Sequence, residues 1–345
     1  MTTTALDGTR TIADRSYGGS RGEGGGIALA LVSASSFGLS GSLARSLLDL
    51  GWTPAAVVAM RVGGAFLILL IPALLILRQV RLPTGRQSVR MLAYGVVAIA
   101  LAQLCYFSAV QYLSVGIALL LEYLAPVMLI AWHWARTHRR PASPVLAGAG
   151  LSIVGLAFVL DLRDGLILNP VGVAWGLAAA VCLSAYFLLS EDKGTETPVH
   201  PLLLTTAGTG VGAVILLAAS AAGILPLAAH TGTTILAGRA AGWWLPVLLL
   251  ILISAVLAYP AGIVAVRRLG SSLASFVSLI EVIFAVVFAF VLLGQRPGLM
   301  QLMGGALILA GIALVQRPIR QKDVAETMLS ERELSERKLV PRSET

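Results

Sequence analysis

Apolar residues occur along most of this chain in continuous blocks, separated by short polar or glycine-containing segments. A helical block of about 17 to 25 residues crosses the roughly 30 Å hydrocarbon core of a bilayer. Membrane-spanning strands are not expected, because the blocks do not alternate between apolar and polar residues. The pattern predicts ten transmembrane helices, at residues 26–48, 54–77, 90–112, 115–134, 144–160, 170–190, 201–222, 243–266, 271–293 and 298–315.

Polar segments at the two ends and in the middle of the chain divide these helices into two groups of five. The first 25 residues are polar and glycine-rich and lack the apolar core of a signal peptide. The last 30 residues are dense in charge. We therefore expect a disordered cytoplasmic N-tail at 1–25, a first five-helix repeat at 26–160, an extracytoplasmic linker at 161–169, a second five-helix repeat at 170–315 and a charged cytoplasmic C-tail at 316–345.

Composition and charge place the chain in a membrane and orient it. It is 57% hydrophobic and 12% charged, whereas a soluble domain has about 25% charged residues. If the N-terminus is cytoplasmic, most positive residues also fall in cytoplasmic segments, as the positive-inside rule requires. Both termini are thus predicted to be cytoplasmic. The exceptions are Arg61 within a span and four arginines outside: Arg45, Arg163, Arg239 and Arg296.

The net charge of +8 follows from this topology and gives no reason to expect nucleic-acid binding, since no compact basic domain is present. Arginine far outnumbers lysine in a chain rich in alanine and glycine, which indicates a bacterial protein and hence the plasma (inner) membrane. The two cysteines, Cys105 and Cys182, lie inside predicted spans, where we expect packing thiols and no disulfide.

The two halves match each other when the chain is compared with itself at an offset of 156 residues. Arg140-Pro141 then falls on Arg296-Pro297, and two glycines of each closing helix coincide. Because a five-helix unit has an odd number of spans, the second copy must enter the membrane from the opposite side. Such inverted repeats suit alternating access around a central site, so the repeat predicts a transporter.

The coinciding glycines are spaced seven residues apart: Gly148 and Gly155 in the first half, Gly304 and Gly311 in the second. A stripe of small residues lets two helices approach closely. We expect this stripe to serve packing within each half; the alternative is the contact face of a homodimer.

Three segments resemble one transporter family. LLLEYLAPV (119–127), MRVGGAFLIL (60–69) and the glycine-rich close of the chain at 276–314 are similar to motifs of the drug/metabolite transporter (DMT) superfamily. Within it, they resemble the EamA family and its threonine/homoserine exporter branch. Two features depart from the family pattern: Glu281 is followed by Val282, and Ser35-Ser36-Phe37 contains no Trp. The resemblance implies a ten-helix fold and export of a small metabolite.

Glu122 is the polar residue that most needs an explanation. It lies eight residues into a predicted span, where insertion of an acidic residue costs roughly 2.5–3.5 kcal/mol unless it faces a cavity or a partner. Pro126 lacks an N–H, so it leaves the carbonyl of Glu122 without its usual donor. Carboxylate and carbonyl together form a candidate site for a cation or an ammonium group. The alternative is a glutamate bonded to a neighbouring helix.

Two further residues are candidates for the same site. Glu281 lies ten residues into the predicted ninth helix and shares a face with Ser278. Arg61 lies in the second helix, where it could bind a substrate carboxylate through two hydrogen bonds or hold two helices together. The other polar residues that could line a cavity, or form interhelical hydrogen bonds instead, are Gln103, Tyr106, Tyr123, Ser184, Tyr186 and Tyr259.

Three classes of function are compatible with a chain of this kind. The first is a secondary transporter that exports a small amino-acid-like metabolite, with protons as the candidate driving ion; a transporter of another metabolite or of a drug-like solute is its variant. The second is a membrane-embedded enzyme, against which stands the absence of HExxH, Cys/His clusters or a nucleophile–base set. The third is a channel or scaffold, which needs no inverted repeat. The sequence favours the transporter, without cofactor or metal.

Overall fold

The computed structural model describes residues 7–78, 85–138, 143–159, 169–190, 200–265, 268–269 and 279–314. The labelled helices of the first half are α1 (Asp7–Asp49), α2 (Pro54–Leu77), α3 (Gly85–Tyr94), α4 (Ala102–Tyr112), α5 (Val115–Glu122), α6 (Ala125–Thr137) and α7 (Ser143–Val159). Those of the second half are α8 (Pro170–Ser190), α9 (Pro201–Ala221), α10 (Trp244–Ile251) and α12 (Ile280–Leu293). Helix also covers 258–265 and 299–314.

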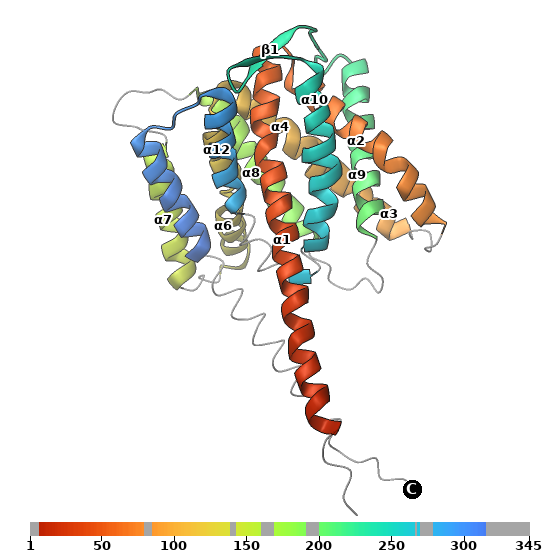
Figure 1. Ribbon diagram of the computed structural model, residues 1–345. Coiled ribbons are helices and arrows are strands. Elements are labelled where there is room, and N and C mark those ends of the chain that lie inside the picture. Colours follow the sequence, from red (N-terminus) through yellow and green to blue (C-terminus); the bar gives the residue numbers. More distant parts are fainter. Residues whose placement is uncertain are drawn as a thin grey trace, which may run out of the picture.

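These helices form a bundle of apolar segments (Figure 1). Among the described residues five helices are long and apolar enough to cross a membrane: Gly25–Leu48, Pro54–Leu77, Met91–Tyr112, Leu202–Ala221 and Trp244–Ala265. Four shorter apolar helices accompany them, at Ser143–Phe158, Pro170–Ala185, Ile280–Leu293 and Leu299–Leu314. The prediction of a helical multi-pass membrane protein is confirmed at this level.

The first helix starts earlier than the sequence predicted. α1 begins at Asp7 and projects beyond the rest of the bundle (Figure 1), so residues 7–25, expected to be a disordered tail, are helical. Its apolar part begins at Gly25, close to the predicted boundary. Adding residues to an existing helix is much easier than nucleating one, and this explains why the helix continues past the apolar segment.

The predicted helix at 115–134 is in fact two helices. α5 ends at Glu122, Tyr123 and Leu124 form a turn, and α6 begins at Ala125 with Pro126 in its first turn. The physical reason is proline: it cannot donate to the carbonyl four residues earlier, and its ring is accepted only at a helix start. The expected kink is therefore a complete break, and it falls directly after Glu122.

The second half has a turn at the equivalent position. At the offset of 156, Tyr123 corresponds to Leu279, which is a turn residue before α12 begins at Ile280. Glu281 therefore lies in the first turn of α12 and not deep inside a described helix. The N-terminal end of a helix carries a partial positive charge, which favours a carboxylate there.

A second feature repeats at the same offset. Gly95–Leu101 and Leu252–Leu257 are both π-helical segments, the first between α3 and α4 and the second after α10. Such segments interrupt the regular hydrogen-bond ladder and leave backbone carbonyls available to other donors, often at functional sites. The two halves thus share their helix irregularities as well as their glycines.

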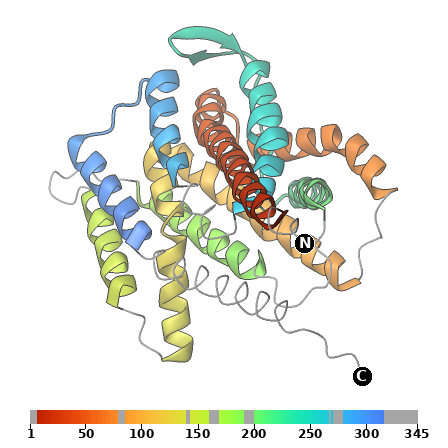
Figure 2. The same cartoon turned by 60° about the horizontal axis from the view of Figure 1, so that its bottom comes forward.

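The closing helices of the two halves, α7 and 299–314, pack against each other side by side at the edge of the bundle (Figure 2). A Cβ atom at Gly155 would lie 2.7 Å from the Gly304 carbonyl oxygen and 2.8 Å from the Ile308 nitrogen. A Cβ at Gly311 would meet the carbonyl of Gly148 and the backbone of Ser152 in the same way. Gly155 thus contacts Gly304, and its equivalent Gly311 contacts Gly148, so the same contact occurs twice.

This reciprocal contact corrects the expectation of packing within each half. The stripe joins the first half to the second, as expected when two similar units are related by a two-fold axis. Ser152 adds a polar contact across the pair, since its Oγ lies 3.4 Å from the Ile308 carbonyl oxygen. Gly155 and Gly311 are therefore used inside the chain and do not provide a free face for a dimer.

A hairpin of β1 (Thr233–Leu236) and β2 (Arg239–Gly242) covers one end of the bundle (Figure 1). The sequence analysis placed no strand here. Thr234 Oγ1 donates to the Ser46 carbonyl near the end of α1 over 2.8 Å, and the Ala237 N–H donates to the Leu292 carbonyl at the end of α12. The hairpin thus connects the ends of α1 and α12, which pack along each other.

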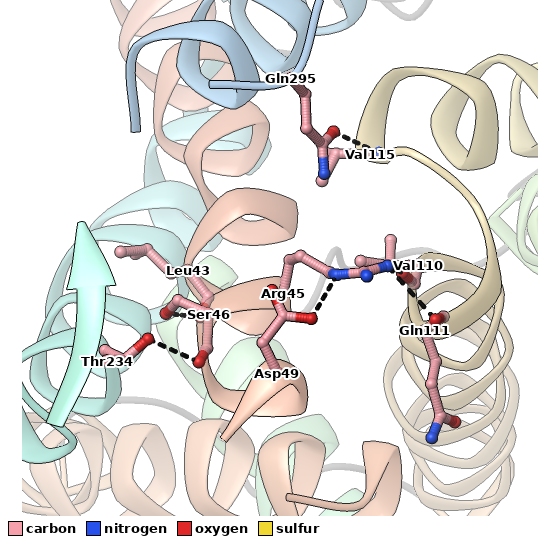
Figure 3. A network of polar contacts seen from close by, with 9 residues as sticks. All are labelled: Leu43, Arg45, Ser46, Asp49, Val110, Gln111, Val115, Thr234 and Gln295. Carbon is pink, nitrogen blue, oxygen red and sulfur yellow. Dashed lines mark hydrogen bonds and ion pairs between the residues drawn. The ribbon is translucent and has the colours of Figure 1, made fainter. Parts of the chain in front are cut away.

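Further polar contacts join helix ends beside the hairpin (Figure 3). Arg45 of α1 forms an ion pair with Asp49 at 2.8 Å and donates from Nη1 to the Val110 carbonyl, also at 2.8 Å. The Gln295 side-chain oxygen accepts a hydrogen bond from the Val115 N–H at 3.2 Å. This end of the bundle is therefore held by hydrogen bonds between α1, α4, α5 and the segment that follows α12.

Candidate substrate and ion site

Arg61 is the most deeply buried charged residue in the described part of the chain. It lies on α2 with 1% of its surface exposed. Its Nη1 donates to Gln103 Oε1 at 2.5 Å, and its Nη2 donates to the Ser254 carbonyl. Ser254 belongs to the π-helical segment 252–257, whose irregular hydrogen bonding makes that carbonyl available.

Three aromatic rings surround the Arg61 guanidinium. Its carbon atom lies 5.9 Å from the ring centre of Phe37, 5.7 Å from Phe107 and 5.8 Å from Tyr259. Each such contact contributes about 0.5–2 kcal/mol, more when water is excluded. Gln103 joins the group to Tyr259 by a hydrogen bond of 2.7 Å from its Nε2 to the Tyr259 hydroxyl oxygen.

Within the described part of the chain, Arg61 nevertheless has no ion pair at contact distance. No carboxylate of the described residues forms an ion pair with it, and its Nε–H has no hydrogen-bond partner there. A buried ion without a counter-ion in direct contact is costly, even when neutral groups solvate it. The arrangement can accept an anion, and a carboxylate is a suitable one, because a guanidinium offers it two parallel N–H donors.

Glu122 is partly buried at the end of α5, directly before the helix break. Within the described residues no side chain or N–H donates a hydrogen bond to its carboxylate. No backbone N–H of the turn after Glu122 donates to its carbonyl either. The side chain and the broken backbone thus present oxygen atoms without donors, and this arrangement can bind a proton, a cation or an ammonium group.

Glu281 differs from Glu122 because it has a partner. The Tyr123 hydroxyl donates to Glu281 Oε2 at 3.1 Å, so the turn in the first half contacts the first turn of α12 in the second. Both carboxylates lie close enough to Arg61 to interact with it electrostatically, and so does Tyr106, which is buried on α4. These residues form one polar centre between the two halves.

The remaining predicted site residues are placed differently. The Ser184 hydroxyl of α8 lies 3.0 Å from the Ala125 carbonyl oxygen and 2.7 Å from the Ala180 carbonyl oxygen, and it can donate to either. The contact with Ala125 joins α8 to the start of α6 and so supports the helix break. Ser278 lies outside the described residues, as do the side chains of Pro126 and Tyr186. The residues that the structure brings together are Arg61, Gln103, Tyr106, Glu122, Tyr123, Tyr259 and Glu281.

Three members of this centre were not predicted. Phe37 and Phe107 provide rings against Arg61, and Ser254 provides only its backbone carbonyl. A sequence does not show which serine will accept a hydrogen bond through its backbone carbonyl. Phe37 could have been predicted, because it is the aromatic residue that ends the small-residue run of the first helix. The free cysteines, Cys105 and Cys182, lie on α4 and α8, which pack against each other.

Arg61 donates hydrogen bonds from two nitrogens to two different acceptors, and this leads to a prediction. In Arg61→Lys the charge is kept, but a single ammonium group cannot reach both Gln103 and the Ser254 carbonyl as the planar guanidinium does. We expect the loss of one hydrogen bond to a charged group, about 1.5 kcal/mol, seen as a lower melting temperature of the purified protein. Arg45→Lys is the matched control, because Arg45 is partly exposed and contributes less; equal melting of Arg61→Lys and the parent would contradict this role.

The fold and this centre define a multi-pass membrane protein of two related halves with buried charges between them, as in transporters. Residues 24–161 and 170–317 each match the EamA-like transporter family. The chain therefore belongs to the EamA family of the drug/metabolite transporter superfamily, and the resemblance noted from its motifs is confirmed. The two matches also confirm the division into two repeats.

Individual relatives agree with this assignment. The chain is 29% identical over 292 residues to the threonine/homoserine exporter RhtA of Escherichia coli (strain K12), covering 83% of this chain and 90% of that protein. It is 27% identical over 216 residues to an uncharacterized transporter of Archaeoglobus fulgidus, covering 61% of this chain and 71% of that protein. A crystal structure with 20% sequence identity aligns with a TM-score of 0.50, covering 82% of this chain and 98% of the other, which supports the fold alone.

Proposed function

We propose that this protein is a secondary transporter that exports a small amino-acid-like metabolite across the bacterial inner membrane by alternating access, coupled to protons. Its family and the name of the Escherichia coli relative support export of such a solute. The observation that carries the proposal is Glu122, a carboxylate at a helix break in the polar centre to which none of the described residues donates a hydrogen bond.

The charges of the centre support ion coupling. It contains one cation, Arg61, and two carboxylates, Glu122 and Glu281. If both carboxylates are ionised, the centre carries one negative charge more than Arg61 can balance, and a buried excess charge is costly. A proton, or the ammonium group of a substrate, neutralises it. Glu122 is the better candidate to bind either, because Glu281 already accepts a hydrogen bond from Tyr123.

The same centre suits a zwitterionic solute. A carboxylate of the substrate can approach Arg61, which forms no direct ion pair with a described carboxylate, while the ammonium group approaches Glu122. Discontinuous helices of transporters commonly bind substrates and ions in this way. Binding of the substrate as Glu122 loses its proton, and reprotonation as the substrate leaves, would couple export to the proton gradient.

The repeated irregularities of the two halves support alternating access. The turn at Tyr123 and Leu279, the two π-helical segments and the reciprocal glycine contacts all recur at one offset. In our proposal the halves are inverted with respect to each other and rock about the site between them. In this arrangement, corresponding helices of the two halves would cross the membrane in opposite directions.

The proposed ten-span topology makes a direct prediction for reporter fusions. We expect an extracytoplasmic signal after Gly51, Leu113, Gly165, Gly232 and Gly298, and a cytoplasmic signal after Gly85, Arg140, Gly194, Gly270 and Gln321. The reason is the excess of positive residues in the segments assigned to the cytoplasm. Alkaline phosphatase and fluorescent-protein fusions measure the two sides; a cytoplasmic signal at Leu113 together with an outside signal at Gly270 would contradict the inverted arrangement.

Transport is tested with the purified protein in lipid vesicles that have an imposed pH gradient. Threonine and homoserine are the first solutes to try, because the Escherichia coli relative is named as their exporter. We expect uptake or release that depends on both the protein and the gradient. Equal movement in vesicles without protein, for these and related amino acids, would count against the proposal.

A further inference from the structure

A cleft of about 370 Å³ lies on the side of the bundle between α5, α12 and the last helix, 299–314. Most of its wall is apolar: Ile117 and Leu120 come from α5, and Val286 comes from α12. It is distinct from the polar centre, since Arg61, Glu122 and Glu281 do not line it. The cleft therefore needs its own explanation.

Two glycines line this cleft at points where its helices pack closely. A Cβ at Gly116 would lie 2.9 Å from Val286 Cγ2, and one at Gly305 would lie 3.3 Å from Leu120 Cδ1. The apolar side chains at its mouth are about half exposed: 54% for Ile283, 48% for Val287 and 49% for Leu302. Such residues in a membrane protein face lipid tails, so the cleft opens toward the hydrocarbon of the bilayer.

The end of the cleft near the hairpin has a different chemistry. Ser114, Gln295, Arg296 and Gln301 line it there, at the segment that links α12 to the last helix. Arg296 is exposed, and none of the described carboxylates pairs with it. The Gln295 and Gln301 side-chain oxygens accept hydrogen bonds from the Val115 and Gly298 N–H groups. The apolar part of the cleft thus ends at Arg296, just after the end of α12.

We propose that this cleft is a binding site for an anionic phospholipid, with an acyl chain in the apolar part and the headgroup phosphate against Arg296. The complementarity is of two kinds: CH₂ groups against aliphatic walls and a negative phosphate against a guanidinium, which binds phosphate through two hydrogen bonds. In the proposed topology Arg296 lies at the outer surface of the membrane, so the lipid comes from the outer leaflet.

The site would hold the lipid between the two halves, since α5 belongs to the first and α12 to the second. A solute on its way through the protein is a poorer occupant, because the carboxylates and Arg61 of the polar centre do not line the cleft. A second copy of the chain would need to place an apolar segment next to Arg296, leaving that charge without a counter-ion. The anionic lipid satisfies both parts of the cleft.

Native mass spectrometry of the full-length protein in detergent, titrated with phosphatidylglycerol or phosphatidylcholine, tests this inference. Both lipids have a phosphate, but in phosphatidylcholine the choline ammonium offsets its charge. We therefore expect the parent to bind phosphatidylglycerol about fivefold more tightly, the equivalent of about 1 kcal/mol for one cation near an anionic lipid. Arg296→Gln should remove this preference. Arg239→Gln, at an exposed arginine of the hairpin outside the cleft, is the matched control and should keep it.

A second pair of variants tests the apolar part. Ala306→Trp adds a large side chain at the exposed rim of the cleft and should weaken binding of both lipids, whereas Met303→Trp, exposed on the same helix but outside the cleft, should bind like the parent. A preference that persists in Arg296→Gln, or equal losses in the two Trp variants, would overturn the proposal. So would a dimer that Ala306→Trp alone dissociates, since the cleft would then be an interface between copies.

Discussion

Replacing Glu122 with glutamine is expected to abolish concentrative export while leaving a folded, membrane-inserted protein. The substitution has the same shape as the protonated acid, and no described residue donates to this carboxylate, so little packing or hydrogen bonding is lost. What disappears is the ability to release and rebind a proton. The variant should therefore bind solute weakly or move it downhill, but it should not build a gradient.

The size of the expected effect follows from the driving force. One proton moving inward under 100 mV supplies about 2.3 kcal/mol of electrical work. At about 1.4 kcal/mol per tenfold concentration ratio, this sustains roughly a fortyfold gradient of a neutral solute before any pH difference is added. In Glu122→Gln the ratio should fall to about one. The measurement is solute accumulation in reconstituted vesicles with an imposed pH gradient and membrane potential.

Glu281→Gln is the matched control for this experiment. Glutamine keeps an amide oxygen that accepts from the Tyr123 hydroxyl, so the contact between the two halves survives. We expect a smaller loss of transport than in Glu122→Gln. Full gradient-driven accumulation by Glu122→Gln would show that this carboxylate does not carry the coupling, whatever the solute is; a larger loss in Glu281→Gln would transfer the role to that residue.

Hydrophobic block lengths predict most of the fold because a spanning helix must satisfy its backbone internally, so its length is fixed by the bilayer. Pro126 was recognised as a disturbance, but a proline alone does not determine whether a helix bends or ends. The hairpin was missed for a local reason. Its turn residues, Ala237 and Gly238, both have positive φ, of 51° and 73°, and Ala-Gly is not the usual Asn-Gly or Asp-Gly signal for such a turn.

The candidate site could be predicted only in part. Charged residues inside spans are rare enough to identify Arg61, Glu122 and Glu281 from the sequence. Their partners depend on how distant helices pack: Tyr123 contacts Glu281 across 158 residues of chain, and Arg61 contacts a carbonyl 193 residues away. One long-range pair was implicit in the repeat, since Gln103 and Tyr259 are hydrogen-bonded and 156 residues apart.

Replacing Gly155 or Gly311 with leucine is expected to lower stability more than any other single change considered for the helix interfaces. The new Cβ at Gly155 would lie 2.7 Å and 2.8 Å from backbone atoms of the last helix, and backbone cannot move aside as a side chain can. Overpacking of this kind costs about 1–3 kcal/mol or more. We expect a lower folded yield and a lower melting temperature, measured by fluorescence-detected size exclusion and thermal unfolding.

Gly150→Leu is the control on the same helix, because a Cβ at Gly150 would have no atom within 4 Å. A leucine facing lipid is favourable by a few tenths of a kcal/mol, so this variant should melt like the parent.

The two-fold relation between the glycines adds a sharper test. Gly155→Leu and Gly311→Leu push apart the same pair of helices, so their effects should not add. Once one leucine has separated the helices, the second meets less resistance, and the double variant should lose less stability than the sum of the single losses. Full additivity, or parental melting of either single variant, would show that these glycines do not share one close contact.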